Sequence, residues 1–159
     1  MTILEQQSSE PSRKLPKWLG WGMIAVSFLG FLDASYLTAT HYLGNEIACS
    51  ILKGCETVTT SSYATWGPIP VALLGAIYYL TVLVLLIAHW DTGRQFPAKL
   101  AAYLTVGGFL FSLWFVYLQI WVIGAICIYC MASAISSSLL FIGGMSALAY
   151  FRPGRSVIS

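Results

Sequence analysis

The chain has 159 residues, of which 58% are hydrophobic and 9% are charged, with a formal net charge of +2 and a mean hydropathy of +0.77. Soluble domains carry about 25% charged residues, so the composition excludes an ordinary soluble protein and is typical of one membrane domain. The small net charge argues neither for nor against nucleic-acid binding. No basic run is present, so we expect no nucleic-acid partner.

The chain divides into one domain with two short tails. Residues 1–15 begin with the polar, patternless MTILEQQSSEPSRK and are predicted to form a disordered cytoplasmic tail. Residues 16–152 are predicted to form the membrane domain, and residues 153–159 a second cytoplasmic tail.

Four apolar stretches are long enough to cross a bilayer, whose core needs roughly 20 apolar residues as helix. The first runs from Trp18 to Leu43, too long for a cleavable secretory signal. The second runs from Pro68 to Ala88 and opens with prolines, which suit a first helical turn. After a polar connection at residues 89–99, residues 100–151 contain no charged side chain and suffice for two helices joined near residues 119–124. We predict an all-α integral membrane protein, a four-transmembrane-helix bundle.

The basic residues predict the orientation of the bundle. With four spans, both termini and the 89–99 connection lie on one side of the membrane. Seven of the eight basic residues fall on that side and only Lys53 falls on the other. Because Lys and Arg concentrate on the cytoplasmic side, both termini are expected to be cytoplasmic or in an equivalent compartment.

All four cysteines are expected at the outer side. Cys49 and Cys55 lie in the outer loop, at about residues 44–66, and Cys127 and Cys130 lie at the outer start of the fourth span. Disulfides form and persist in that compartment. The alternative is a non-catalytic membrane scaffold whose thiols bind zinc or make structural disulfides. The cysteine spacing fits a zinc site poorly, and such short rings would remove little chain entropy.

Redox chemistry explains the cysteine pattern better. Cys127 and Cys130 are three residues apart and share a helix face. Cys127 is expected in the first helical turn, where the helix dipole lowers the pKa of a thiol, with Cys130 one turn closer to the hydrocarbon. Such a pair can pass electrons to a lipid-soluble acceptor, and a quinone is the obvious one. A mobile loop carrying Cys49 and Cys55 can then shuttle electrons by thiol–disulfide exchange.

At these residues the sequence resembles the vitamin K epoxide reductase family, in its bacterial and plastid branch. The shared features are the loop pair Cys49 and Cys55, Ser61 six residues later, and the stretches "DASYLTATHY", "GPIPVALLG" and "CIYC". The resemblance covers residues 18–151. The loop pair precedes the C-x-x-C pair, an order that differs from the other quinone-linked thiol oxidases of bacterial envelopes.

The resemblance implies a bundle around a quinone, with the outer loop capping the quinone site. It implies an enzyme, a quinone-dependent thiol-disulfide oxidoreductase, in which Cys55 takes electrons from a thioredoxin-like partner and Cys49 passes them to Cys127. Cys130 would face the quinone, and Ser61 would bind a quinone oxygen. The residues alone do not distinguish this hydroxyl from its neighbours, Thr60 and Ser62.

The expected quinone is ubiquinone, menaquinone, plastoquinone or phylloquinone. The expected membrane is the bacterial inner membrane or the thylakoid, with the cysteines on the periplasmic or lumenal side. Since no fused thioredoxin-like domain follows the fourth span, the partner is expected to be a separate protein. Ala134 stands where animal members of the family have a tyrosine implicated in vitamin K binding, so plain quinone reduction is expected rather than epoxide reduction.

Other polar residues in the spans have two interpretations. Asp33 is a functional candidate because an intramembrane carboxylate is costly, but a hydrogen-bonded structural role competes. His41 could relay protons or sit in the headgroup layer. The "SAISSS" run and Gly143–Gly144 are predicted to supply small residues for helix packing rather than chemistry.

Overall fold

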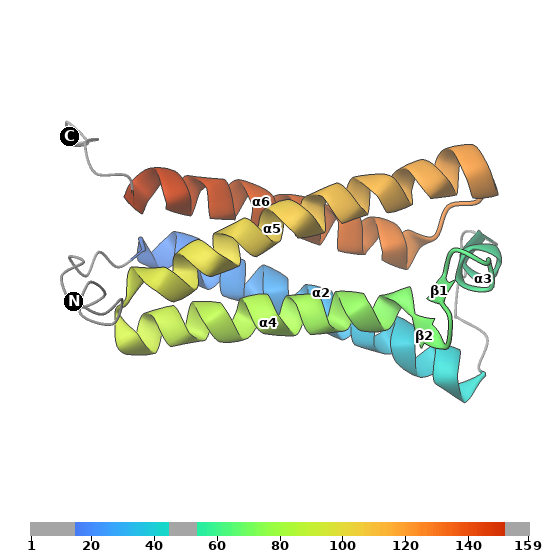
Figure 1. The fold of residues 1–159 in the computed structure, drawn as a ribbon, viewed down its shortest axis with the longest axis horizontal. Helices are drawn as coiled ribbons and strands as arrows, with labels where there is room; N and C mark the ends of the chain where they lie inside the picture. Colours follow the sequence, from blue (N-terminus) through green and yellow to red (C-terminus); the bar gives the residue numbers. More distant parts are fainter. Residues whose placement is uncertain (1–14, 45–53, 152–159) are drawn as a thin grey trace, which may run out of the picture.

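A computed structural model describes residues 15–44 and 54–151. Its body is a bundle of four long helices lying side by side (Figure 1). They are α2 (Lys17–Leu43), α4 (Val71–Thr92), α5 (Gln95–Tyr117), which continues as the π-helical segment η2 (Leu118–Ile123), and α6 (Ile128–Phe151). All four are long and apolar enough to cross a membrane, which confirms the predicted four-span fold.

The helices contact one another in a ring, in the order α2, α4, α5, α6 and back to α2. Glycines allow the closest approaches. A Cβ atom added at Gly30 would lie 2.5 Å from the ring of Tyr79, and one added at Gly143 would lie 2.9 Å from the Met23 side chain. Small residues let membrane helices approach closely, so the predicted packing role of Gly143 is confirmed.

The connection between α4 and α5 is much shorter than the predicted 89–99 segment. Gly93 ends α4 with a φ of 68°, in the left-handed region that favours glycine, and its N–H donates to the His89 carbonyl. Helix α5 then starts at Gln95, so Pro97 lies in its first turn. Proline is tolerated there because the N–H groups of a first turn have no partner within the helix.

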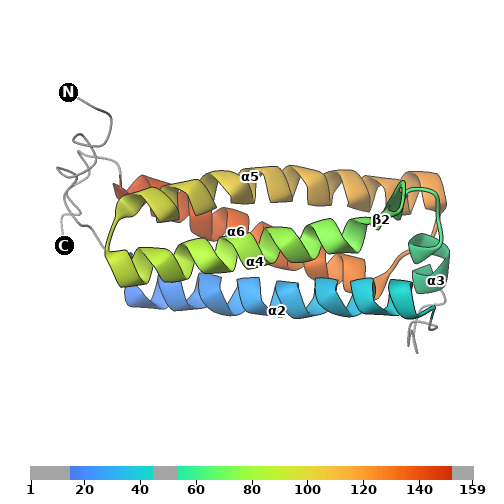
Figure 2. The same ribbon diagram turned by 60° about the horizontal axis from the view of Figure 1, so that its bottom comes forward.

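One end of the bundle carries a small cap (Figures 1 and 2). It consists of the short helix α3 (Gly54–Thr59) and an antiparallel hairpin of β1 (Thr65–Trp66) and β2 (Ile69–Pro70). The second span therefore begins at Val71 rather than at Pro68, because the N–H of Val71 closes the hairpin on the Ala64 carbonyl at 2.9 Å. Helix α2 begins and helix α6 ends at the opposite end of the bundle (Figure 1).

Leu15, which the sequence analysis assigns to the first tail, is packed into this opposite end. Its side chain is 3% exposed and lies in a cluster with Ala98, Ala147 and Phe151. Its N–H also donates to Nε2 of His89 at 3.4 Å. The ordered domain therefore includes Leu15, because an apolar side chain gains by leaving water.

Candidate active site

The turn between α5 and α6 places Cys127 directly before α6. Segment η2 ends at Ile123 and is capped by Gly124, whose φ of 67° again lies in the left-handed region. The chain then crosses residues 124–127 without helical structure, and the Cys127 carbonyl accepts the N–H of Met131 at 3.0 Å. The prediction that Cys127 lies within the first helical turn is therefore wrong by one residue. The chain reverses direction over these four residues, so Cys127 is the N-cap residue of α6.

Hydrogen bonds to its sulfur favour the thiolate form of Cys127. The pKa of this thiol is lowered from 9.0 to about 7, and the largest cause is the hydrogen bond from the Cys130 side chain. The backbone N–H groups of Tyr129 and Cys130, in the first turn of α6, act in the same direction. Burial and the Asp33 carboxylate oppose them. The predicted direction is right, but the neighbouring thiol contributes more than the helix terminus.

Helix α3 brings Cys55 against this turn. Cys55 and Cys127 are both fully buried and belong to one apolar cluster with Val58. The approach depends on Gly54, because a Cβ atom there would lie 2.5 Å from the carbonyl oxygen of Ile126. Cys55 is disulfide-bonded, whereas Cys127 carries a free thiol.

The structure thus brings together three of the four predicted cysteines. The third is Cys130, which packs against the same cluster and also has a free thiol. Cys49 lies outside the described residues. All three described cysteines are at the capped end of the bundle, as predicted from the order of the spans.

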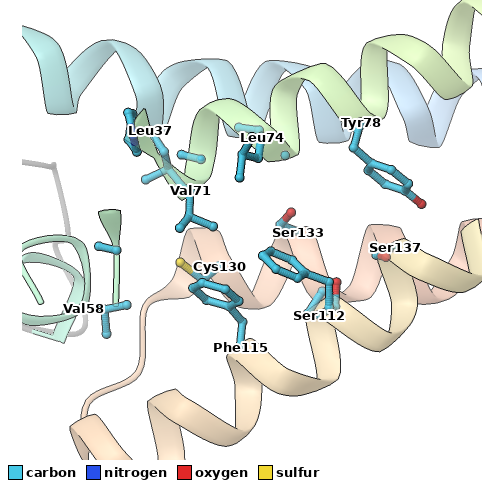
Figure 3. A pocket seen from close by; sticks show the side chains of 18 of the residues that line it. Leu37, Val58, Val71, Leu74, Tyr78, Ser112, Phe115, Cys130, Ser133 and Ser137 are labelled. Atoms are coloured by element: carbon cyan, nitrogen blue, oxygen red, sulfur yellow. The ribbon is translucent and has the colours of Figure 1, made fainter. Parts of the chain in front are cut away.

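A cavity of about 430 Å³ opens between the four helices beside Cys130. Figure 3 shows the sulfur of Cys130 among the lining side chains, with Val71 from α4 and Phe115 from α5 nearby. Cys127 is not part of that lining. The two thiols of the C-x-x-C pair therefore face different surroundings. Cys127 faces the cap and Cys130 faces the cavity.

Most of the cavity wall is apolar, and hydroxyl groups supply its polar part. The Tyr79 hydroxyl donates to the Ser133 carbonyl at 2.7 Å and lies 3.0 Å from the Ser133 hydroxyl. Tyr78 and Ser137 also line the cavity, but their hydroxyl oxygens are buried within its wall, where the two side chains interact with each other.

Ser61 lines the cavity from the cap side, whereas its neighbours Thr60 and Ser62 do not. Its hydroxyl donates to the Val58 carbonyl at 2.7 Å. Donation to a ligand oxygen would therefore require rotation of the Ser61 side chain away from that carbonyl.

Sequence reasoning missed the serines of α6. Ser133 and Ser137, from the run assigned to packing, line the cavity together with Ala134. A signal was present, because Cys130, Ser133, Ala134 and Ser137 follow the spacing of one helix face. Small residues serve packing and cavity walls equally well, so a place in the wall is compatible with the packing role predicted for the run.

The two polar residues of α2 differ in their surroundings. His41 is exposed but also lines the cavity, near the capped end. Asp33 is half-buried, and its Oδ2 atom is buried without a hydrogen-bond partner in the described part of the chain. Within residues 15–44 and 54–151, no group of three or more His, Cys, Asp and Glu side chains could hold a metal ion.

Comparison with known proteins agrees with this arrangement. A sequence profile described as the vitamin K epoxide reductase family matches residues 21–143, which include Cys55, Cys127 and Cys130. A search among curated proteins finds no match. The profile covers well over half of the chain, so the chain belongs to the vitamin K epoxide reductase family, a family of membrane oxidoreductases that link thiols to quinones.

Proposed function

We propose that this protein is a membrane thiol:quinone oxidoreductase that generates disulfides in a separate thioredoxin-like partner. Electrons pass from the partner to Cys55 and Cys49, then to Cys127 and Cys130, and finally to a membrane quinone. One observation carries the proposal. Cys130 hydrogen-bonds the sulfur of Cys127 on one side and lines the cavity on the other, so it can connect a buried thiol to a cavity ligand.

The cavity suits a quinone head group. Its volume of about 430 Å³ falls within the range of about 300–1,000 Å³ for small-molecule sites, which are mostly apolar with a few polar groups. Ser61 would hold a quinone oxygen, because it lines the cavity and its hydroxyl can rotate away from the Val58 carbonyl. When bound, the quinone supplies an acceptor for two electrons and two protons.

The exchange steps balance without any other redox agent. A partner thiolate opens the Cys49–Cys55 disulfide at Cys55, and a second partner thiol releases Cys55, so the partner becomes a disulfide. The freed Cys49 thiolate attacks Cys127 of the Cys127–Cys130 disulfide, and Cys130 leaves as thiolate. Cys55 then attacks Cys49, and the electron pair of the Cys49–Cys127 bond leaves on Cys127. The combination of a bonded Cys55 with free Cys127 and Cys130 thiols matches the state after this transfer.

The Cys127–Cys130 dithiol then loses two electrons and two protons to the quinone and becomes a disulfide again. We further propose that the capped end faces the periplasm or the lumen, where the partner is accessible. The basic residues support this orientation, since those in the described part of the chain, Lys17, Arg94 and Lys99, lie at the opposite end.

The test uses the full chain in detergent or vesicles, with a reduced thioredoxin-like protein and a quinone whose absorbance is followed. Cys130→Ala should abolish quinone reduction with any donor. Cys49→Ala should abolish reduction driven by the protein donor but spare reduction driven by a small dithiol that reaches Cys127. If all four single cysteine replacements leave turnover intact, the proposal is wrong.

A further inference from the structure

Gln119 is a buried polar residue with no role in the chemistry described so far. It lies in the π-helical segment η2, and its side chain is 1% exposed. Its Oε1 atom accepts the backbone N–H of Cys127 at 3.1 Å. A backbone N–H can only donate, so the amide must present its oxygen to Cys127 and its nitrogen elsewhere.

The backbone of Gln119 holds the other end of the same turn. Its carbonyl accepts the N–H of Gly124, and also the N–H of Ala125 at 3.1 Å. One residue therefore anchors both the start and the end of the segment that carries Cys127. Gln119 lies in a π-helical segment, and such segments frequently occur at functional sites.

The second amide group of Gln119 lacks a partner. Its Nε2 atom is buried without a hydrogen-bond acceptor among the described residues. A buried, unpaired donor is costly, and such groups are few in native proteins. The amide contacts Cys127, whose cluster combines apolar side chains such as Val58 and Ile123 with the sulfurs of Cys55 and Cys130. No acceptor of the described residues, the neutral Cys127 sulfur included, is bonded to Nε2, so a partner can form only when a neighbouring group moves or gains charge.

We propose that Gln119 is a positioning residue for the thiol exchange at Cys127. Its Oε1 holds the backbone of Cys127 at the cap of α6, and its Nε2 donates to the Cys127 sulfur when that sulfur becomes anionic. The charge appears when Cys55 bonds to Cys49 and the electron pair of the Cys49–Cys127 bond leaves on Cys127. This role rests on the proposed function, which supplies the thiol-exchange step that Gln119 would assist.

The test is the ionisation of Cys127 in the reduced full chain, followed by ultraviolet thiolate absorbance against pH, with Cys127→Ser as the blank. Gln119→Met keeps the side-chain volume but can neither accept nor donate. We expect the midpoint to rise by about one pH unit, the shift that corresponds to one lost hydrogen bond to a charged group. Donor-driven turnover at neutral pH should fall about tenfold, with the KM for quinone unchanged.

Two further variants make the result decisive. Gln95→Met makes the same change at a glutamine that is 5% exposed at the opposite end of the bundle, and it should leave the midpoint at the wild-type value. Gln119→Glu retains an acceptor for the Cys127 N–H, so it keeps the turn folded even if Gln119→Met does not. It removes the donor and adds a carboxylate beside Cys127, so its midpoint should rise at least as far as that of Gln119→Met.

The inference is overturned if both Gln119 variants titrate like the wild type. The titration involves no quinone. A wild type that fails to reduce quinone would therefore contradict the proposed function and leave the Gln119 result to be judged separately.

Discussion

Replacing Gly54 with alanine should uncouple the cap from the C-x-x-C pair. Gly54 opens α3, one residue before Cys55, and its Cα faces the backbone of Ile126, one residue before Cys127. An alanine Cβ would lie 2.5 Å from the Ile126 oxygen and 2.9 Å from its nitrogen. Neither atom can rotate away, because both belong to the main chain.

The size of the effect follows from these distances. Ordinary van der Waals contact begins at 3.4 Å, so a contact at 2.5 Å must open by about 0.9 Å. Alanine stabilises a helix by at most about 1 kcal/mol relative to glycine, whereas overpacking costs about 1–3 kcal/mol. The net effect is therefore unfavourable, and we expect α3 to be displaced from the turn. A misplacement of about 1 Å can lower a rate about 100-fold, and disulfide exchange needs the attacking sulfur in line with its target.

The assay compares two electron donors in the same preparation. Turnover driven by a reduced thioredoxin-like protein passes through the cap and should fall about 100-fold in Gly54→Ala. Turnover driven by a small dithiol that reaches Cys127 directly should stay near the wild-type rate. Gly22→Ala is the matched control, because no atom lies within 4 Å of the added Cβ.

Equal rates for wild type and Gly54→Ala with the protein donor would refute this reasoning. They would mean that the contact between α3 and the C-x-x-C turn does not position the loop thiols. An equal loss with both donors would instead place the damage in the C-x-x-C turn or the cavity.

Three further predictions concern the bundle core and the cavity. Cys130→Ala removes the S–H that donates to the Cys127 sulfur, so the pKa of Cys127 should rise from about 7 towards 9.0. A raised pKa leaves less thiolate at neutral pH, so alkylation of Cys127 at pH 7 should be slower in this variant, as measured by peptide mass spectrometry. An unchanged pH profile of alkylation would contradict this prediction. Ala134→Phe fills part of the cavity and should raise the KM for quinone about tenfold, while exchange between loop and C-x-x-C thiols continues in a stopped reaction without quinone. Tyr79→Phe removes the hydrogen bonds to Ser133 and should lower the free energy of unfolding by about 1 kcal/mol. Thermal unfolding in detergent measures the change, and an unaltered midpoint would show that this link between α4 and α6 does not stabilise the bundle.

The spans were predictable because each depends on local composition. A helix in lipid satisfies its own backbone groups, so an uncharged run of sufficient length is enough to predict one. The charge-free stretch at residues 100–151 indicated two helices, and the structure places their break at residues 124–127, just after the predicted position. Boundaries such as those of Pro68 and Pro97 were less predictable, because proline suits both a first helical turn and a hairpin.

The candidate site was predictable only where covalent spacing sets the geometry. Cys127 and Cys130 are neighbours because only two residues, Ile128 and Tyr129, separate them. Gln119 gave no signal, since one glutamine in an apolar segment does not reveal that its side chain turns back to the Cys127 N–H. The contact brings together residues eight positions apart across a chain reversal, and the segment η2 that carries Gln119 also packs against α3.

The amino-acid sequence by itself determined the four helices and the gathering of the described cysteines at one end, because chain length and apolar character decide both before any helix meets another. Only the tertiary structure decided that Cys130 faces the cavity, that Cys127 faces the cap, and that serines of α6 line the wall. Those facts depend on how each long helix is rotated about its axis. That rotation is set by packing between residues far apart in the chain, such as Gly30 of α2 against Tyr79 of α4.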